Sequence, residues 1–439
     1  MRSPPTPIIP ALATRREIFA WAMFDFANSG YTTVVLTAIF NVYFVGVIAG
    51  AHTSGAATFL WTLATAITNI LVLVTAPVLG AIADHGAHKK RFLLASTVGC
   101  VLFTALLGTL GPGDIAAAMV LVILASIMYG TGENLIAAFL PEIARQEDMG
   151  RISGYGWSLG FIGGLLVLGV CLGYITWAKQ AGQVATQFVP VTLWITAAAF
   201  GLAAIPTFLW LPERAVPVAM PPGQSYMRIG FARVRHTLKH ARHYRDLFRF
   251  LWALAIYYCG IYTVIVLAAV YAEQVMGFNQ QEIIFLILIV NVTAAVGSLV
   301  FGLFQDRLGS VVTLGLTLVI WIVALLLAYV AESRALFWVV ANLIGLAMGA
   351  SQSAGRALVG QFSPPQRAAE FFGLWGLASK LAAAVGPPVY GLIAYASHGN
   401  HRMALLSTAG FFIVGLLVLA TVNERRGRVA ALVVHATPV

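Results

Sequence analysis

Long apolar segments alternate with short polar ones along the chain, and one longer polar stretch separates them into two sets of six. The expected spans cover residues 19–48, 56–82, 92–110, 115–140, 152–175 and 188–211, and then 250–271, 283–304, 311–330, 336–359, 371–395 and 404–422. A helix crosses a bilayer with about 20 apolar residues, whereas strands of a membrane barrel are about half as long. The pattern therefore predicts an all-α membrane protein with twelve transmembrane helices. It divides the chain into an N-terminal six-helix half at 1–211, a linker at 212–249 and a C-terminal six-helix half at 250–439.

The composition supports a membrane location. Of the 439 residues, 60% are hydrophobic and 10% are charged, whereas soluble domains average about 45–50% apolar and about 25% charged residues. This excludes an ordinary soluble enzyme, and it excludes a disordered chain, which needs low hydrophobicity and high charge. Cys100, Cys171 and Cys259 lie singly in apolar segments, so they form neither a disulfide framework nor a zinc pattern.

The net charge of +10 follows from the loops on one side of the expected membrane. If the N-terminus is cytoplasmic, the cytoplasmic segments hold 21 of the 26 Lys and Arg residues and the opposite loops hold 3. An excess of Lys and Arg in cytoplasmic loops orients membrane proteins. We therefore expect both termini and the linker in the cytoplasm, and we expect no nucleic-acid partner.

The linker carries a basic pattern with helical spacing. Arginines recur every seven residues from Arg228 to Arg249, with apolar residues at three- and four-residue steps between them. This pattern predicts an amphipathic helix on the inner leaflet, where anionic lipids attract Arg; DNA or calmodulin binding is the competing interpretation. His236, His240 and His243 recur at a spacing that could hold zinc, but arginines surround them, and we expect no metal site.

Two loops of the chain repeat each other. Gly80 is followed by Asp84 after the second span, and Gly302 is followed by Asp306 after the eighth span, 222 residues later. In addition, a glycine of the fourth span corresponds to one of the tenth, Gly130 to Gly349. Repeated halves of this kind place a substrate site at their interface, near the membrane midplane.

The repeated loops resemble those of the major facilitator superfamily, although in the first copy Gly86 follows His85 directly. The segment WAMFDFANSGY at 21–31 and the segment EFFG at 370–373 are similar to the branch of bacterial facilitators related to fungal vacuolar autophagy-linked amino-acid effluxers. This resemblance implies a transporter of the bacterial inner membrane in which spans one, four, seven and ten line a cavity. It implies export of amino acids. It also implies a gate on the cytoplasmic side. The gate residues would be Asp84, Arg91, Asp306 and Arg307.

Four charged residues lie inside the expected spans, namely Asp25, Glu133, Arg356 and Lys380. Counted from the helix ends at about 1.5 Å per residue, all four lie roughly 12–15 Å deep, so the two acids and two bases share one layer. Charges inside a membrane are costly and usually face a cavity or one another. We expect Asp25 or Glu133 to carry a proton and the two bases to hold an anionic group such as a carboxylate. The same faces of these spans add Asn28, Tyr258, Tyr262 and Gln352 to the expected site.

No other motif indicates an enzyme or a cofactor. The chain has no G-x-x-x-x-G-K-[ST] pattern for ATP, and we expect no cofactor. The G-x-S-x-G pattern at 156–160 could mark a serine hydrolase, but that chemistry needs a histidine, and all nine lie outside the spans. Gly156, Gly160 and Gly164 instead indicate close helix packing. We expect a proton-coupled secondary transporter of a small molecule; a non-transporting receptor or the permease subunit of an ATP-driven pump are the alternatives.

The charge distribution makes a topology prediction. Cysteines placed one at a time at His52 and Gly399 should react with an impermeant reagent on intact cells, whereas cysteines at Gly223 and His435 should not. Strong labelling at position 223 would contradict the predicted orientation.

Overall fold

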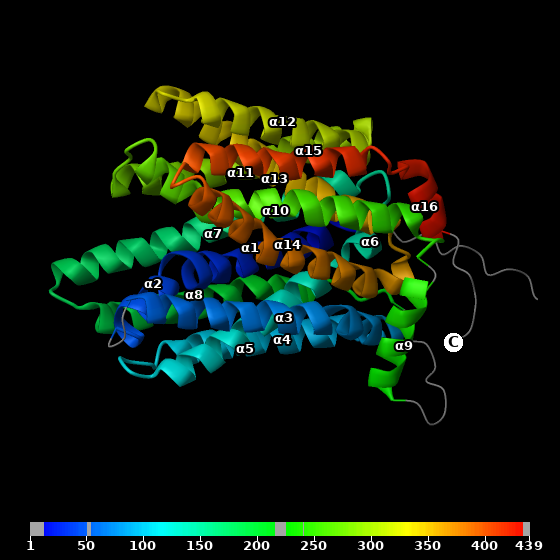
Figure 1. The fold of residues 1–439 in the computed structure, drawn as a ribbon. Coiled ribbons are helices and arrows are strands. Elements are labelled where there is room, and N and C mark those ends of the chain that lie inside the picture. The colour runs from blue at the N-terminus through cyan, green and yellow to red at the C-terminus, as the bar shows by residue number, and fades with distance from the viewer. Residues whose placement is uncertain (1–12, 51–53, 216–224, 240, 433–439) are drawn as a thin grey trace, which may run out of the picture.

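The computed structural model describes residues 13–50, 54–215, 225–239 and 241–432, and every regular element in these ranges is helical (Figure 1). Within them, twelve helices are long and apolar enough to cross a membrane, as expected from the apolar segments. His52, Gly223, His240 and His435 lie outside the described ranges.

The first half consists of the helices that precede the linker. Its first span begins with α1 and continues through α2 and two π-helical segments to Ile48, and a short helix, α6, precedes the fifth span. The bounds are α1 Arg15–Tyr31, the π-helical segments Thr32–Ala38 and Phe44–Ile48, α2 Phe40–Tyr43, α3 Ser54–Gly86, α4 Lys89–Leu107, α5 Ile115–Ala137, α6 Leu140–Ile143, α7 Met149–Gln180 and α8 Ala185–Trp210.

The second half follows the linker helix α9, Tyr226–Lys239. Its elements are α10 Arg245–Gln274, α11 Gln280–Leu308, α12 Ser310–Val330, α13 Arg334–Phe362, a 3-10 turn at Pro365–Arg367, α14 Ala368–Ala396, α15 His401–Leu419 and α16 Glu424–Leu432. The first helix of this half begins five residues earlier than the apolar pattern predicts. Asp246 in its first turn accepts hydrogen bonds from the Arg426 side chain and the Asn423 backbone, which fixes the extra turn.

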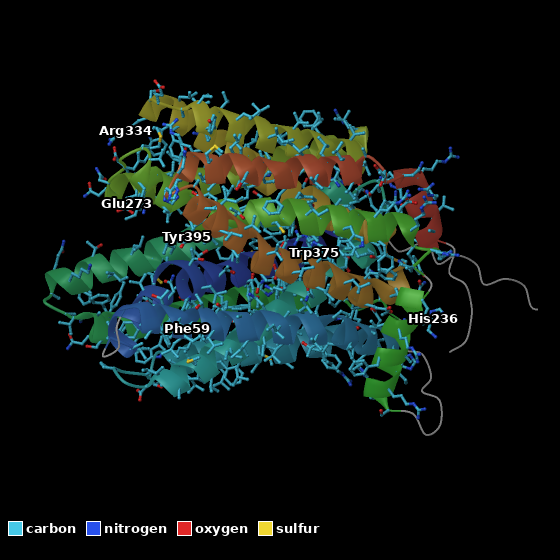
Figure 2. The ribbon with its side chains drawn as sticks, viewed as in Figure 1. Phe59, His236, Glu273, Arg334, Trp375 and Tyr395 are labelled. Carbon is cyan, nitrogen blue, oxygen red and sulfur yellow. The ribbon has the colours of Figure 1, made fainter. Side chains whose placement is uncertain are left out.

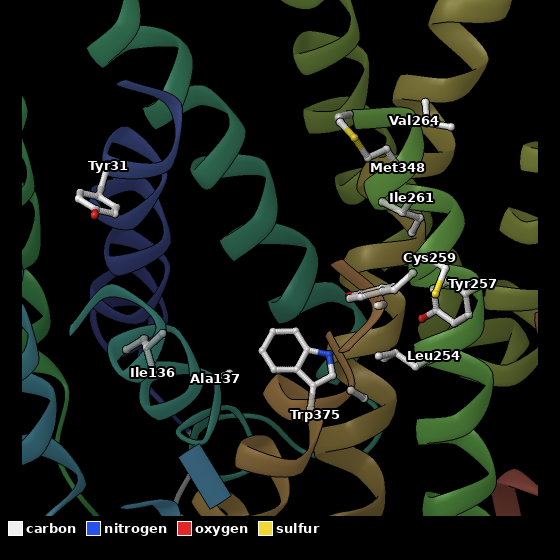
Figure 3. Packing of buried hydrophobic residues seen from close by; sticks show 14 of the residues in the cluster. Tyr31, Ile136, Ala137, Leu254, Tyr257, Cys259, Ile261, Val264, Met348 and Trp375 are labelled. Atoms are coloured by element: carbon white, nitrogen blue, oxygen red, sulfur yellow. The ribbon is translucent and has the colours of Figure 1, made fainter. Parts of the chain in front are cut away.

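The two halves lie against each other along their length (Figure 1). Contacts between them are made mainly by α3 with α14 and by α7 with α11. Helices α9 and α16 lie at the same end of the bundle, which we call the basic end because the Lys and Arg residues of both helices gather there. His236 marks this end in Figure 2, Glu273 and Arg334 mark the opposite end, and Trp375 lies between them.

The halves repeat each other in detail at the basic end. Glu213, which follows α8, accepts hydrogen bonds from the backbone N–H groups of Lys89 and Lys90 at the start of α4. Glu424, which follows α15, accepts one from the N–H of Val311 at the start of α12. A carboxylate satisfies the free N–H groups and the positive dipole of a helix start. The repeated Glu-Arg pair at 213–214 and 424–425 is the sequence signal for these two caps.

Candidate transport site and gate

An ion pair inside the membrane joins the two halves. The Arg356 guanidinium of α13 donates a hydrogen bond of 2.6 Å from Nη1 to Oδ2 of Asp25 on α1. Arg356 is 3% exposed, and the Asp25 side chain is 12% exposed. An ion pair this deep needs hydrogen bonds to its remaining polar atoms. The free-energy cost of removing both charges from water can exceed the attraction between them.

The rest of the Arg356 guanidinium is held by the first half. Its Nε donates to Oγ of Ser153 at 3.1 Å, and its Nη2 donates to the backbone oxygen of Ser153 at 2.9 Å. The rings of Trp21 and Trp157 lie 4.6 and 5.4 Å from its central carbon. Every nitrogen of the guanidinium therefore has a partner on α1 or α7, although the side chain belongs to the other half.

A glycine makes this insertion possible. A Cβ atom at Gly156 would lie 2.5 Å from Nη2 of Arg356 and would also collide with Asp25. Gly160 and Gly164, one and two turns further along α7, pack in the same way against Ser29 and Thr33 of α1. The G-x-S-x-G pattern therefore serves helix packing, as its spacing predicts.

The other two intramembrane charges face each other across the halves without direct contact. Lys380 of α14 reaches α5, because a Cβ atom at Gly130 would lie 4.0 Å from its Cε, but neither Lys380 nor Glu133 forms an ion pair within the described ranges. The Lys380 ammonium lies 6.0 Å from the Tyr129 ring centroid, in the range of a cation–π contact. The four charges thus form one direct pair and one separated pair, which the depth estimate alone does not distinguish.

The other side chains expected in the site come from both halves. Tyr262 of α10 and Ser379 of α14 share a hydrogen bond of 2.7 Å, and the Tyr258 ring packs edge-on against Tyr262. Asn28 Oδ1 and Gln352 Oε1 are buried without a hydrogen-bond partner in the described part of the chain. Buried polar atoms normally have partners, so these two acceptors are free to take hydrogen bonds from a bound molecule.

Two carboxylates at the basic end bind across the halves in equivalent ways. Asp84 at the end of α3 accepts from the N–H groups of Ala369 and Glu370 at 3.1 and 2.9 Å, at the start of α14. Asp306 at the end of α11 accepts from the N–H groups of Gly150 and Arg151 at 2.8 and 3.0 Å, at the start of α7. Each aspartate therefore caps a helix of the opposite half, where the helix dipole favours negative charge.

Glycines let the backbones approach closely at both caps. A Cβ atom at Gly302 would lie 2.8 Å from the Gly150 carbonyl oxygen, and one at Gly80 would collide with the Ala369 backbone. A Cβ atom at Gly373 would lie 2.6 Å from Cα of Pro77. The repeated glycines that precede Asp84 and Asp306 in the sequence therefore have a steric role next to the electrostatic role of the aspartates.

The basic residues expected in the gate lie elsewhere. Arg91 and Arg307 are exposed, and neither side chain contributes to the ion pairs of the described residues. Lys89 takes the place expected for Arg91: it is 0% exposed, its ammonium lies 3.7 Å from Asp84, and it donates to Glu142 of α6. The observed neighbour of Asp84 differs from the expected one because the rotation of α4 directs Lys89 inward and Arg91 outward.

The linker helix α9 packs against both halves at the basic end. A Cβ atom at Gly230 would lie 2.9 Å from Ile82 of α3, so the two helices are in close contact. Thr237 donates to the buried Glu370 carboxylate of α14, and Arg233 lies 3.8 Å from the same group. The basic face of α9 nevertheless stays exposed, with Arg228 and Arg235 pointing away from the protein.

Sequence patterns could reveal only part of this site. The ring of Trp21 and the hydroxyl of Ser153 also hold Arg356, yet no sequence pattern predicts these contacts. Glu370 lies in the EFFG segment that carries the family resemblance, but its role in holding α9 depends on tertiary contacts. Among the described residues, no three His, Cys, Asp or Glu side chains gather as a metal site.

Comparison with known proteins identifies the family of this chain. Residues 41–432 match the family described as vacuole effluxer Atg22 like. The chain belongs to this family. Among its relatives, the uncharacterized MFS-type transporter YxiO of Bacillus subtilis is 28% identical over 409 residues, which cover 92% of this chain and 94% of YxiO. Autophagy-related protein 22-1 of Aspergillus fumigatus is 24% identical over 335 residues, which cover 70% of this chain and 54% of the fungal protein.

Solved structures show the same fold at low sequence identity. The human organic anion transporter MFSD10 aligns with a TM-score of 0.71 at 15% identity, over 92% of this chain and 99% of MFSD10. The proton:xylose symporter XylE aligns with a TM-score of 0.68 at 14% identity, over 94% of this chain and 96% of XylE. This Atg22-like protein is therefore a transporter of the major facilitator superfamily, with the twelve-helix fold expected from its sequence.

The capping geometry generates a prediction for Asp306. In Asp306→Asn, the side chain loses its charge at the start of α7, and its NH₂ group cannot accept from an N–H. We expect the basic end to open more often, since a loss of about 1.4 kcal/mol shifts a two-state ratio tenfold. Distance distributions between spin labels on the two halves at the basic end should show a larger long-distance population.

The neighbouring Arg307→Gln is the matched control, because it removes an exposed charge that holds no contact across the seam. An Asp306→Asn distribution that coincides with that of the unmodified protein would contradict the gate role.

Proposed function

We propose that this protein is a proton-coupled secondary transporter that exports a small solute across a bacterial inner membrane by alternating access. The basic end would lie in the cytoplasm, as the excess of Lys and Arg in its loops supports. The observation that carries the proposal is the ion pair between Asp25 and Arg356, because it connects two halves that must separate during transport.

In the proposed cycle, the described conformation is the one that is closed toward the cytoplasm. The aspartate caps, the contacts of Lys89 with Asp84 and Glu142, and the Asp25–Arg356 pair all lie between the middle of the membrane and the basic end. Opening that end requires Arg356 to leave Asp25, Ser153 and the two tryptophan rings together. Such a concerted change suits a switch between two states, since packed interfaces are bistable rather than continuously deformable.

Separation of the ion pair would supply proton coupling. A carboxylate stays charged beside a cation and favours the proton-bound form when it is buried alone. Asp25 would experience both situations in one cycle, whereas Glu133 would experience a smaller change because its basic neighbour is not in contact. We therefore favour Asp25 as the proton carrier and retain Glu133 as the second candidate.

The substrate would bind where Lys380 and Glu133 face each other. Lys380 would hold a carboxylate, Glu133 would hold a positive group or a proton, and the free acceptors of Asn28 and Gln352 would take hydrogen bonds from the solute. This chemistry suits amino acids and related solutes. The family description, vacuole effluxer, supports transport of a solute across a membrane. The linker helix α9 would contact anionic lipids with its exposed arginines.

The test compares Asp25→Asn with Glu133→Gln in proteoliposomes, with a substrate first identified by a thermal-shift screen of amino acids, peptides and organic anions. Neutralising the proton carrier should abolish accumulation driven by a pH gradient and spare exchange, because counterflow needs no net proton movement. The other variant should retain pH-driven transport. If both variants keep full pH-driven transport, neither acid is the carrier.

A further inference from the structure

Arg91 forms no ion pair among the described residues, and its position on α4 points to the lipid side of the bundle. It is exposed in the first turn of the helix, and Leu94, Val98 and Leu102 follow at helical spacing on the same face. These three apolar residues are 46%, 56% and 52% exposed. One stripe of α4 therefore runs from a basic residue at the basic end along an outward-facing apolar surface.

This stripe forms one wall of a groove of about 540 Å³ between α4 and α8. The α4 wall includes Leu94, Val98 and Leu102, and the α8 wall includes Gly201, Ile205 and Leu209. Gly201 contributes depth, because a Cβ atom there would have only Val101 within reach, at 3.9 Å. The volume lies in the range of ligand-binding pockets, about 300–1,000 Å³.

Basic groups gather where the groove reaches the basic end. The Arg16 guanidinium lies 5.3 Å from the ring centroid of Trp210, the residue after Leu209. Lys90 donates to the backbone oxygen of Leu211 at 2.6 Å, which places its ammonium beside the same end of α8. Arg91, which forms no ion pair in the described part of the chain, adds a third basic group beside the Glu213 carboxylate, so the groove is apolar along its length and basic at its mouth.

The internal repeat shows that this charge is not required by the fold. Lys89, Lys90 and Arg91 begin α4, whereas the equivalent positions 222 residues later hold Val311, Val312 and Thr313 at the start of α12. Lys89 is accounted for by the gate, but the exposed Arg91 is not. The basic residues at the start of α4 therefore have no counterpart at the start of α12.

We propose that the α4–α8 groove is a binding site for an anionic phospholipid. One acyl chain lies along the apolar walls, and the headgroup phosphate binds Arg91 and Arg16 at the mouth. Basic pockets beside membrane helices bind anionic headgroups through this combination of charge and apolar contact. The charge at the mouth favours this occupant over a second copy of the chain, because a phosphate headgroup neutralises the basic groups there.

Native mass spectrometry of the purified protein tests the proposal by titration with dioleoylphosphatidylglycerol and, separately, with dioleoylphosphatidylcholine. Arg91→Gln should weaken retention of the first lipid about fivefold, the effect of about 1 kcal/mol for one basic residue near a membrane surface. Val98→Trp should weaken retention of both lipids by filling the groove. Arg307→Gln and Val319→Trp are the matched controls, because they change an exposed arginine and an exposed apolar residue of the second half.

Equal retention of phosphatidylglycerol by the unmodified protein and by Arg91→Gln would overturn the headgroup assignment. Unchanged retention in Val98→Trp would overturn the groove as the chain site. A dimer that Val98→Trp dissociates would show that a second copy, not a lipid, occupies the groove.

Discussion

A charge inside a bilayer has no water to stabilise it, and this constraint shapes the centre of the molecule. Arg356 is stable there only because Asp25, Ser153 and two tryptophan rings of the other half surround it. Removing one member of a buried pair typically costs about 3–5 kcal/mol, because the remaining charge stays without compensation. The second half alone cannot compensate the Arg356 charge, so the ion pair holds the two halves together. Gly156 follows from the same requirement, since any side chain there would displace the pair.

The contacts at the basic end differ from the central pair in kind. Asp84 and Asp306 bind backbone N–H groups at helix starts, so water can replace them when the seam opens. Contributions of this type reach about 2 kcal/mol each in partly buried geometries. The helix-cap hydrogen bonds of the gate are individually weak and reversible, and they surround one buried ion pair. Such a gate can close and still open. The symmetry of the two caps also explains why the internal repeat preserves glycine and aspartate at both loops.

The sequence predicts the fold well because the fold depends on length and hydropathy. Twelve apolar segments, a repeat and four intramembrane charges suffice for the spans and the interface between halves. The pairing is a different matter: depth along each helix places Asp25, Glu133, Arg356 and Lys380 in one layer, but only the rotation of the helices brings Arg356 to Asp25. The same limit explains Lys89 and Arg91, two residues apart on α4, of which the inward one joins the gate. The contacts of linker helix α9 with Ile82 and Glu370 are also tertiary, so the basic amphipathic pattern of its sequence does not predict them.

The central claim is that the Asp25–Arg356 pair holds the basic end closed. Ser298 on α11 reports on it, because it is 0% exposed in the seam against Gly154 and its hydroxyl donates to the Ala295 backbone oxygen of its own helix. The measurement is the rate at which a cysteine at position 298 is alkylated in reconstituted protein, with Asp25 intact and with Asp25→Asn. The account predicts slow alkylation with Asp25 and a rate at least about tenfold higher with Asn, the effect of a shift of about 1.4 kcal/mol. Equal rates in the two proteins would contradict it.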